Sequence, residues 1–114
     1  MNIESLSLFG SRIVSADLTS LKKLKYANLA KNNLTALQIG SLKNLETLYL
    51  FKNKLLTTNF EGVVALTKMG VMQNKLTVLD MSPLQSLTEA YLWDNQLEDL
   101  QIKGLDNLEF LDVK

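Results

Sequence analysis

Apolar residues recur along the chain with a constant spacing of 21 residues. Within each repeat, three apolar positions lie three and then two residues apart, so a short segment alternates between apolar and polar side chains. Alternation with a period of two predicts a β-strand with one buried face. Because one strand cannot bury that face alone, we expect successive strands to stack as the layers of a solenoid. The first apolar column contains Ile3, Leu24, Leu45, Leu66, Leu87 and Leu108.

The period runs through the chain without an insertion, which indicates a single domain over residues 1–114. Solenoids normally end in atypical polar repeats that cover the last core layer, and the first repeat here is only mildly irregular. We therefore expect a fragment of a longer protein, or open edge strands that pair with another chain. The repeats span residues 3–23, 24–44, 45–65, 66–86 and 87–107, followed by a partial repeat at 108–114.

A column of asparagines keeps the same spacing, three residues after the last apolar strand position. This column lies where the chain turns away from the strand. An asparagine amide can bond both donors and acceptors of the backbone, in its own turn and in the neighbouring one. We expect a structural ladder there, because it would satisfy polar groups that burial leaves unpaired. The ladder consists of Asn32, Asn53, Asn74 and Asn95.

The repeat resembles the leucine-rich-repeat pattern L-x-x-L-x-L-x-x-N-x-L. It reads LKYANLAKNNLTAL from Leu24, LETLYLFKNKL from Leu45 and LTEAYLWDNQLEDL from Leu87. The period is most similar to bacterial surface repeats of the internalin type and their relatives in Bacteroidetes. This resemblance implies an α/β-type, strand-dominated solenoid that coils in a right-handed sense. It also implies a concave parallel sheet of about six short strands, one per repeat, and short extended or 3₁₀ segments on the convex side.

Aromatic residues concentrate at the strand positions that point away from the core. The chain has eight aromatic residues, and seven of them fall in these solvent-facing rows. Core packing predicts the opposite, since large apolar side chains gain free energy by burial. Tyr49 with Phe51, and Tyr91 with Trp93, are expected to form two walls about 10 Å apart, twice the strand spacing. Gly70 would form the floor between them.

Exposed apolar groups of this kind usually mark interaction sites, and Tyr and Trp are enriched in binding hot spots. The alternative is structural, because aromatic residues also favour strands and support one another across neighbouring strands. We favour a partner-binding surface on the concave face. Its expected residues are Tyr26, Tyr49, Phe51, Met72, Tyr91 and Trp93, with Lys52, Lys68, Glu89 and Asp94 at the rim.

Charge is balanced overall but unevenly distributed. Residues 1–57 hold eight basic and three acidic residues, a net charge of +5, whereas residues 58–114 hold four and nine, a net charge of −5. The neutral total argues against bulk attraction to nucleic acid or to an anionic membrane. A pair such as Lys68 and Glu89, on neighbouring strands, is expected to be a solvated ion pair.

A protein-binding or adhesion module is the favoured function. A carbohydrate-binding surface and a self-associating repeat remain alternatives. We do not expect an enzyme, a metal or a cofactor, because the chain has no histidine or cysteine and no phosphate-binding glycine loop. No apolar run is long enough to span a bilayer, so membrane insertion is not expected. The family resemblance implies an extracellular or bacterial-surface location.

Overall fold

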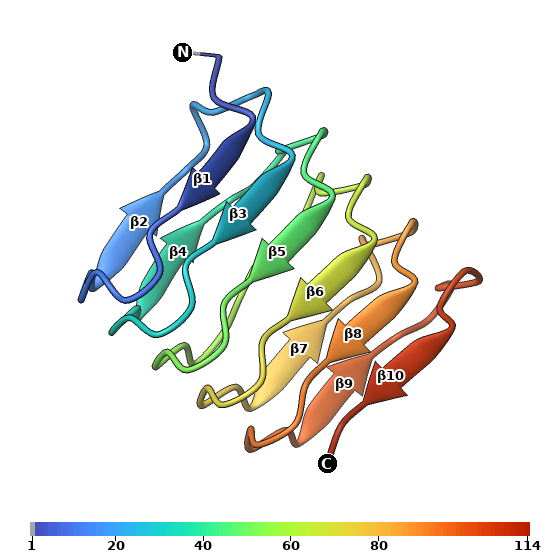
Figure 1. Cartoon of the computed structure of the whole chain (residues 1–114). Helices are drawn as coiled ribbons and strands as arrows, with labels where there is room; N and C mark the ends of the chain where they lie inside the picture. The colour runs from blue at the N-terminus through green and yellow to red at the C-terminus, as the bar shows by residue number, and fades with distance from the viewer. Residues whose placement is uncertain (1) are drawn as a thin grey trace.

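The computed structural model describes residues 2–114, which form a coil of short β-strands without any helix in that range (Figure 1). Every strand has three residues, because the extended segments of each repeat are short and end in turns. The strands are β1 (Ser5–Ser7), β2 (Ser15–Asp17), β3 (Tyr26–Asn28), β4 (Ala36–Gln38), β5 (Thr47–Tyr49), β6 (Lys68–Gly70), β7 (Val78–Asp80), β8 (Glu89–Tyr91), β9 (Asp99–Gln101) and β10 (Phe110–Asp112).

One parallel sheet of six strands contains one strand from each repeat, in the order β1-β3-β5-β6-β8-β10. Its register follows the period of 21 residues: Leu6 pairs with Ala27, and Leu48 pairs with Met69. The predicted repeat solenoid with a strand-dominated parallel sheet is therefore confirmed. The α/β label is wrong for the described residues, because the chain between successive strands of this sheet folds into turns and further short strands and contains no helix.

The opposite side of the coil carries two smaller parallel sheets, β2-β4 and β7-β9 (Figure 1). The expected extended segments are thus present, and single tight turns connect them where 3₁₀ helices were the other possibility. One such turn closes through Leu21 N–H, which donates to Leu18 O over 3.0 Å. The third repeat interrupts this side, since residues 57–59 form no strand.

The space between the two sides is filled by the apolar columns. Leu24, Leu45, Leu66 and Leu87 are all fully buried. Phe60, the one aromatic residue placed in a core column, is 1 % exposed. Each buried leucine contributes about 2–5 kcal/mol relative to alanine, so stacking of the repeats supplies most of the stability.

The asparagine column joins each turn to the preceding repeat. The Nδ2 group of Asn53 donates to Leu29 O and Leu50 O, both over 3.0 Å, while its Oδ1 accepts from Leu34 N–H over 3.0 Å. Asn74 and Asn95 repeat these contacts one and two layers further on. The side chains therefore occupy backbone groups that burial would otherwise leave without partners.

The residue before each ladder asparagine, or before Ser11 in the first repeat, has a left-handed backbone conformation that the repeat pattern did not predict. The φ angle is 57° at both Lys31 and Lys52, and 69° at Gly10 in the first repeat. Gln73 and Asp94 follow with φ of 60° and 59°. Only Gly10 adopts this conformation without steric strain, so the turn geometry overrides local preference in four repeats.

Candidate interaction surface

The outer face of the six-stranded sheet carries the predicted aromatic residues. In β3, β5 and β8, the central residues Ala27, Leu48 and Ala90 are fully buried, and the residues on either side of each are half-buried. Alternation thus directs tyrosines outward from the core on three strands. We call the set Tyr26, Tyr49, Phe51, Met72, Tyr91 and Trp93 the aromatic face.

One group of rings lies over the N-terminal strands. The ring centroids of Tyr26 and Tyr49 are 6.1 Å apart, with an interplanar angle of 72°. Those of Tyr49 and Phe51 are 6.2 Å apart, at 73°. Edge-to-face packing of this kind orients the rings relative to one another and stabilises them by about 0.5–1.5 kcal/mol per pair beyond burial.

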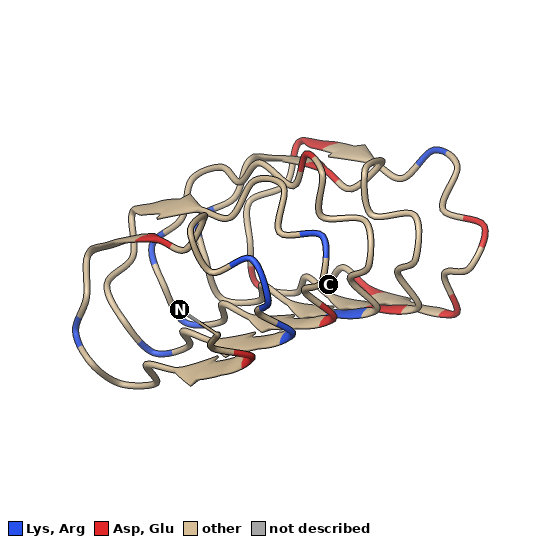
Figure 2. Ribbon diagram, turned by 90° about the horizontal axis from the view of Figure 1, so that it is seen from above, with Lys and Arg blue, Asp and Glu red and all other residues tan. Residues whose placement is uncertain are grey.

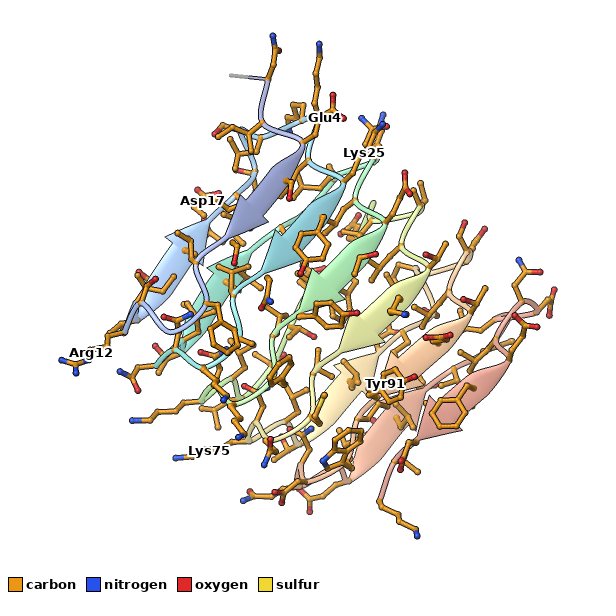
Figure 3. All side chains as sticks on the ribbon, viewed as in Figure 1. Glu4, Arg12, Asp17, Lys25, Lys75 and Tyr91 are labelled. Carbon is orange, nitrogen blue, oxygen red and sulfur yellow. The ribbon has the colours of Figure 1, made fainter. Side chains whose placement is uncertain are left out.

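A second group lies over the C-terminal strands, where Figure 3 labels Tyr91 on β8. Its ring centroid is 5.9 Å from that of Trp93, at 87°, and 5.2 Å from that of Phe110, at 45°. Phe110 is 47 % exposed and was not among the predicted site residues. The available signal was its register, because it occupies the same row of the sheet as Tyr26.

The strand between the two groups is covered. Gly70 is buried, and a Cβ atom added to it would stand 3.1 Å from Tyr49 Cδ1 and 3.4 Å from Met72 Sδ. Tyr49 and Met72 thus lie close against the position where glycine has no side chain. Ala30, which the 21-residue spacing places in the same outward row as Phe51 and Met72, is also fully buried.

Lys68 and Glu89 lie on neighbouring strands within the aromatic face. Lys68 Nζ is 3.4 Å from Glu89 Oε2, and Tyr91 Oη donates to the same oxygen over 3.5 Å. The hydrogen bond to Glu89, together with electrostatic interactions with Tyr49 and Glu89, raises the pKa of Lys68 above its usual value. Both side chains are more than one-third exposed, at 42 % and 37 %, so the pair contributes little to stability.

The two remaining rim residues, Lys52 and Asp94, lie in exposed turns that follow the strands. A cation there can reach the aromatic rows: Lys31 Nζ lies 5.3 Å from the centroid of the Phe9 ring. Figure 3 shows Arg12 and Lys75 at this edge of the sheet, whereas Glu4 and Lys25 lie at the opposite edge. Charged side chains therefore border the aromatic face at the C-terminal ends of the sheet strands.

The described part of the chain shows no group of three or more acidic side chains that could hold a metal ion, and no helix that could cross a membrane. No protein-family model and no curated protein matches the chain. The repeat architecture accordingly rests on the period of 21 residues and on the strand register that follows it.

Proposed function

We propose that this chain is a leucine-rich-repeat binding module that holds a protein partner on its aromatic face. The observation that carries the proposal is the exchange of large and small residues between core and surface. Tyr26 and Tyr91 stand on the outer face beside the fully buried Ala27 and Ala90. Full burial of an aromatic side chain is worth about 1.5–3 kcal/mol, and the fold forgoes part of this stabilisation at each of these strands.

The rings of the aromatic face are held in fixed positions, which favours binding of a partner. Tyr26, Tyr49 and Tyr91 extend from strands that are hydrogen-bonded to both neighbours. Phe51 and Trp93 follow just after two of these strands, and the rings in each group pack against one another. A side chain that is already held in place loses little conformational entropy when a partner binds. Met72, between the groups, adds a flexible apolar side chain that adapts to different partners.

Variants of the aromatic face test the proposal. Phe51→Ser combined with Trp93→Ser removes one ring from each group. Leu56→Ser with Val78→Ser is the matched control, because these apolar side chains are 60 % and 48 % exposed and lie outside the aromatic face. The probe is a displayed random-peptide library selected on the wild-type chain. We expect the selected peptides to lose at least about tenfold in affinity for the aromatic variant, consistent with loss of a hot spot.

Three outcomes would contradict the proposal. The selected peptides could bind both double variants as tightly as the wild type. A glycan array could yield sugars that quench Trp93 fluorescence while no peptide is selected, which would favour carbohydrate binding. Light scattering over a range of concentrations could show that the aromatic variant alone abolishes an oligomer, which would assign the face to a second copy.

Adhesion and a bacterial-surface location belong to the same proposal and are supported by the resemblance of the repeat motif. An antibody against the chain, applied to fractionated and to intact cells of the source organism, tests the location. Labelling of intact cells is expected. Signal confined to the soluble internal fraction would reject this part of the proposal and leave the binding face to be judged separately.

A further inference from the structure

Basic side chains line one edge of the aromatic face without interruption over four layers. The turns at residues 10–14, 31–35, 52–56 and 73–77 follow β1, β3, β5 and β6, and they contain five cationic residues and no carboxylate. The opposite edge mixes both signs, as the Lys25–Glu4 ion pair illustrates. We call the cationic edge the turn ridge; it consists of Arg12, Lys31, Lys52, Lys54 and Lys75.

The cations of the turn ridge have no carboxylate partners within the described chain. All five residues are exposed, and the ion pairs found among residues 2–114 are Lys25–Glu4 and Lys68–Glu89. Lys31 instead lies above the ring of Phe9. The ridge therefore presents positive charge that the chain itself does not neutralise.

The backbone of the ridge is firmly held. Lys31 N–H donates to Phe51 O over 2.9 Å, and Lys52 N–H donates to Met72 O over 3.1 Å. Asn53 ties the same turns together through its side chain. Cations therefore follow one another along the coil at the strand spacing of about 4.8 Å. Each of the four layers carries at least one, although Asn33 and Gln73 take the corresponding places in the second and fourth layers. Lys31 and Lys52 also have a left-handed backbone conformation, in which glycine would be less strained. Lysine therefore occupies these positions at a cost in backbone strain.

The sign of the edge reverses in the fifth repeat. In the turn at residues 94–98, Asp94 takes the position of Lys31 and Lys52, Gln96 takes that of Lys54 and Lys75, and Glu98 adds a second carboxylate. Figure 2 shows acidic residues gathered toward the end of the coil that is distant from the N-terminus. A uniform polyanion laid along the edge would be repelled at this turn, whereas a polypeptide can change its own charge at the matching point.

We propose that the turn ridge binds an acidic segment of the partner protein, which runs along the coil axis beside the aromatic face. The inference rests on the proposed function, because the acidic segment belongs to the same protein partner that binds the aromatic face. Acidic side chains of the segment would face Lys31, Lys52, Lys54 and Lys75, and its apolar side chains would contact Phe51 and Trp93.

The probe is a synthetic peptide that alternates glutamate with leucine, and its counterpart has lysine in place of glutamate. Lys54→Gln with Lys75→Gln removes two ridge charges one repeat apart. Lys22→Gln with Lys43→Gln is the matched control, since it removes the same charge, one repeat apart, at the opposite edge. We expect the ridge variant to lose at least about fivefold in affinity for the acidic peptide at low salt, and most of that difference to vanish at about 1 M salt.

Equal losses in the two lysine variants would overturn the inference, because net charge alone would then explain binding. Tighter ridge-dependent binding of a sulfated polysaccharide or a single-stranded oligonucleotide would overturn the assignment to a protein. Phe51→Ser with Trp93→Ser separates the two proposals. If that variant loses peptide affinity while the ridge variant does not, the ridge inference fails and the proposed function stands. The reverse result would uphold the ridge and reject the aromatic face.

Discussion

The side chain of Thr58 lies at the centre of the interruption in the smaller sheets. It stands in a column otherwise filled by Ala16, Leu37, Leu79 and Leu100, and its buried Oγ1 atom has no hydrogen-bond partner. A hydroxyl in that position loses its bonds to water without replacement. The third repeat thus carries a local defect on the side of the coil that lies opposite the aromatic face.

Thr58→Val should therefore stabilise the protein. The substitution keeps the side-chain shape and removes the unsatisfied hydroxyl, so we expect the free energy of unfolding to rise by about 1 kcal/mol. Urea denaturation would measure it. The exposed neighbour serves as control, because Thr57→Val should change stability by less than about 0.5 kcal/mol. A less stable Thr58→Val protein would show that the hydroxyl finds a partner.

Gly62 and Gly104 occupy equivalent turns with similar backbone conformations but different surroundings. Comparing them distinguishes the cost of backbone strain from the cost of close packing. Gly62 and Gly104 have φ angles of 79° and 80°. A Cβ atom on Gly62 would stand 2.8 Å from Ser41 Cα, whereas a Cβ on Gly104 would meet no atom within 4 Å. Alanine at either position incurs the left-handed strain, and only alanine at Gly62 also forces two repeats apart.

We expect Gly104→Ala to lower the free energy of unfolding by about 1–2 kcal/mol, the usual cost of a left-handed non-glycine residue. Gly62→Ala should cost about 1–3 kcal/mol more, because overpacking adds to the strain. Thermal and urea denaturation of both variants would show the difference. Equal decreases in the free energy of unfolding for the two variants would contradict the prediction, because the added Cβ atom at Gly62 would then displace Ser41 without destabilising the protein.

At the scale of the element, the asparagine ladder stabilises the turns that the strands cannot. Asn74 is 7 % exposed, and its side chain accepts from Leu55 N–H and donates to Leu50 O and Val71 O. Three-residue strands provide few backbone hydrogen bonds of their own. Between layers, the turns are joined by these side-chain amides in addition to backbone hydrogen bonds such as that from Lys52 N–H to Met72 O.

Asn74→Ala should lower the free energy of unfolding by about 1–3 kcal/mol or more, since it leaves several buried backbone groups without partners. Asn33→Ala is the control. Asn33 is exposed in an equivalent turn, and its side chain makes no hydrogen bond among the described residues. Equal melting temperatures for Asn74→Ala and the wild type would reject the structural role of the ladder.

At the scale of the whole molecule, each repeat contacts its neighbours on either side, so stability is distributed along the coil axis. The central strands have neighbours on both sides, and Leu48 and Met69 are fully buried there. Leu6 of β1 and Leu111 of β10, at the ends of the sheet, are only partly buried. The core is thus most complete in the middle of the described chain.

Amide hydrogen exchange should follow this gradient. We expect the slowest exchange in β5 and β6 and the fastest in β1 and β10, because opening a terminal layer exposes less apolar surface. Measurement of the wild-type chain by mass spectrometry would resolve the repeats. Uniform protection from β1 to β10 would indicate a single cooperative unit and contradict the prediction.

The sequence by itself determined the layered architecture, the strand register and the side of the sheet on which each residue lies. Period-two alternation and the 21-residue repeat are local properties of the chain, and they place Tyr49 outward and Leu48 inward without reference to any other contact. The hydrogen bonds of Asn53 and Asn74 follow from the same register, since a fixed period aligns each amide with the same backbone groups.

The tertiary structure alone decided which of these positions are accessible. Gly70 and Ala30 are buried although they lie on outward rows, and at Gly70 the larger side chains of Tyr49 and Met72 stand close by. Phe110 joins the rings around Tyr91 for the same reason: a side chain's direction follows from its own strand, but its coverage depends on how its neighbours lean. The left-handed turn residues, such as Lys52, were likewise set by the closure of the repeat and not by local preference.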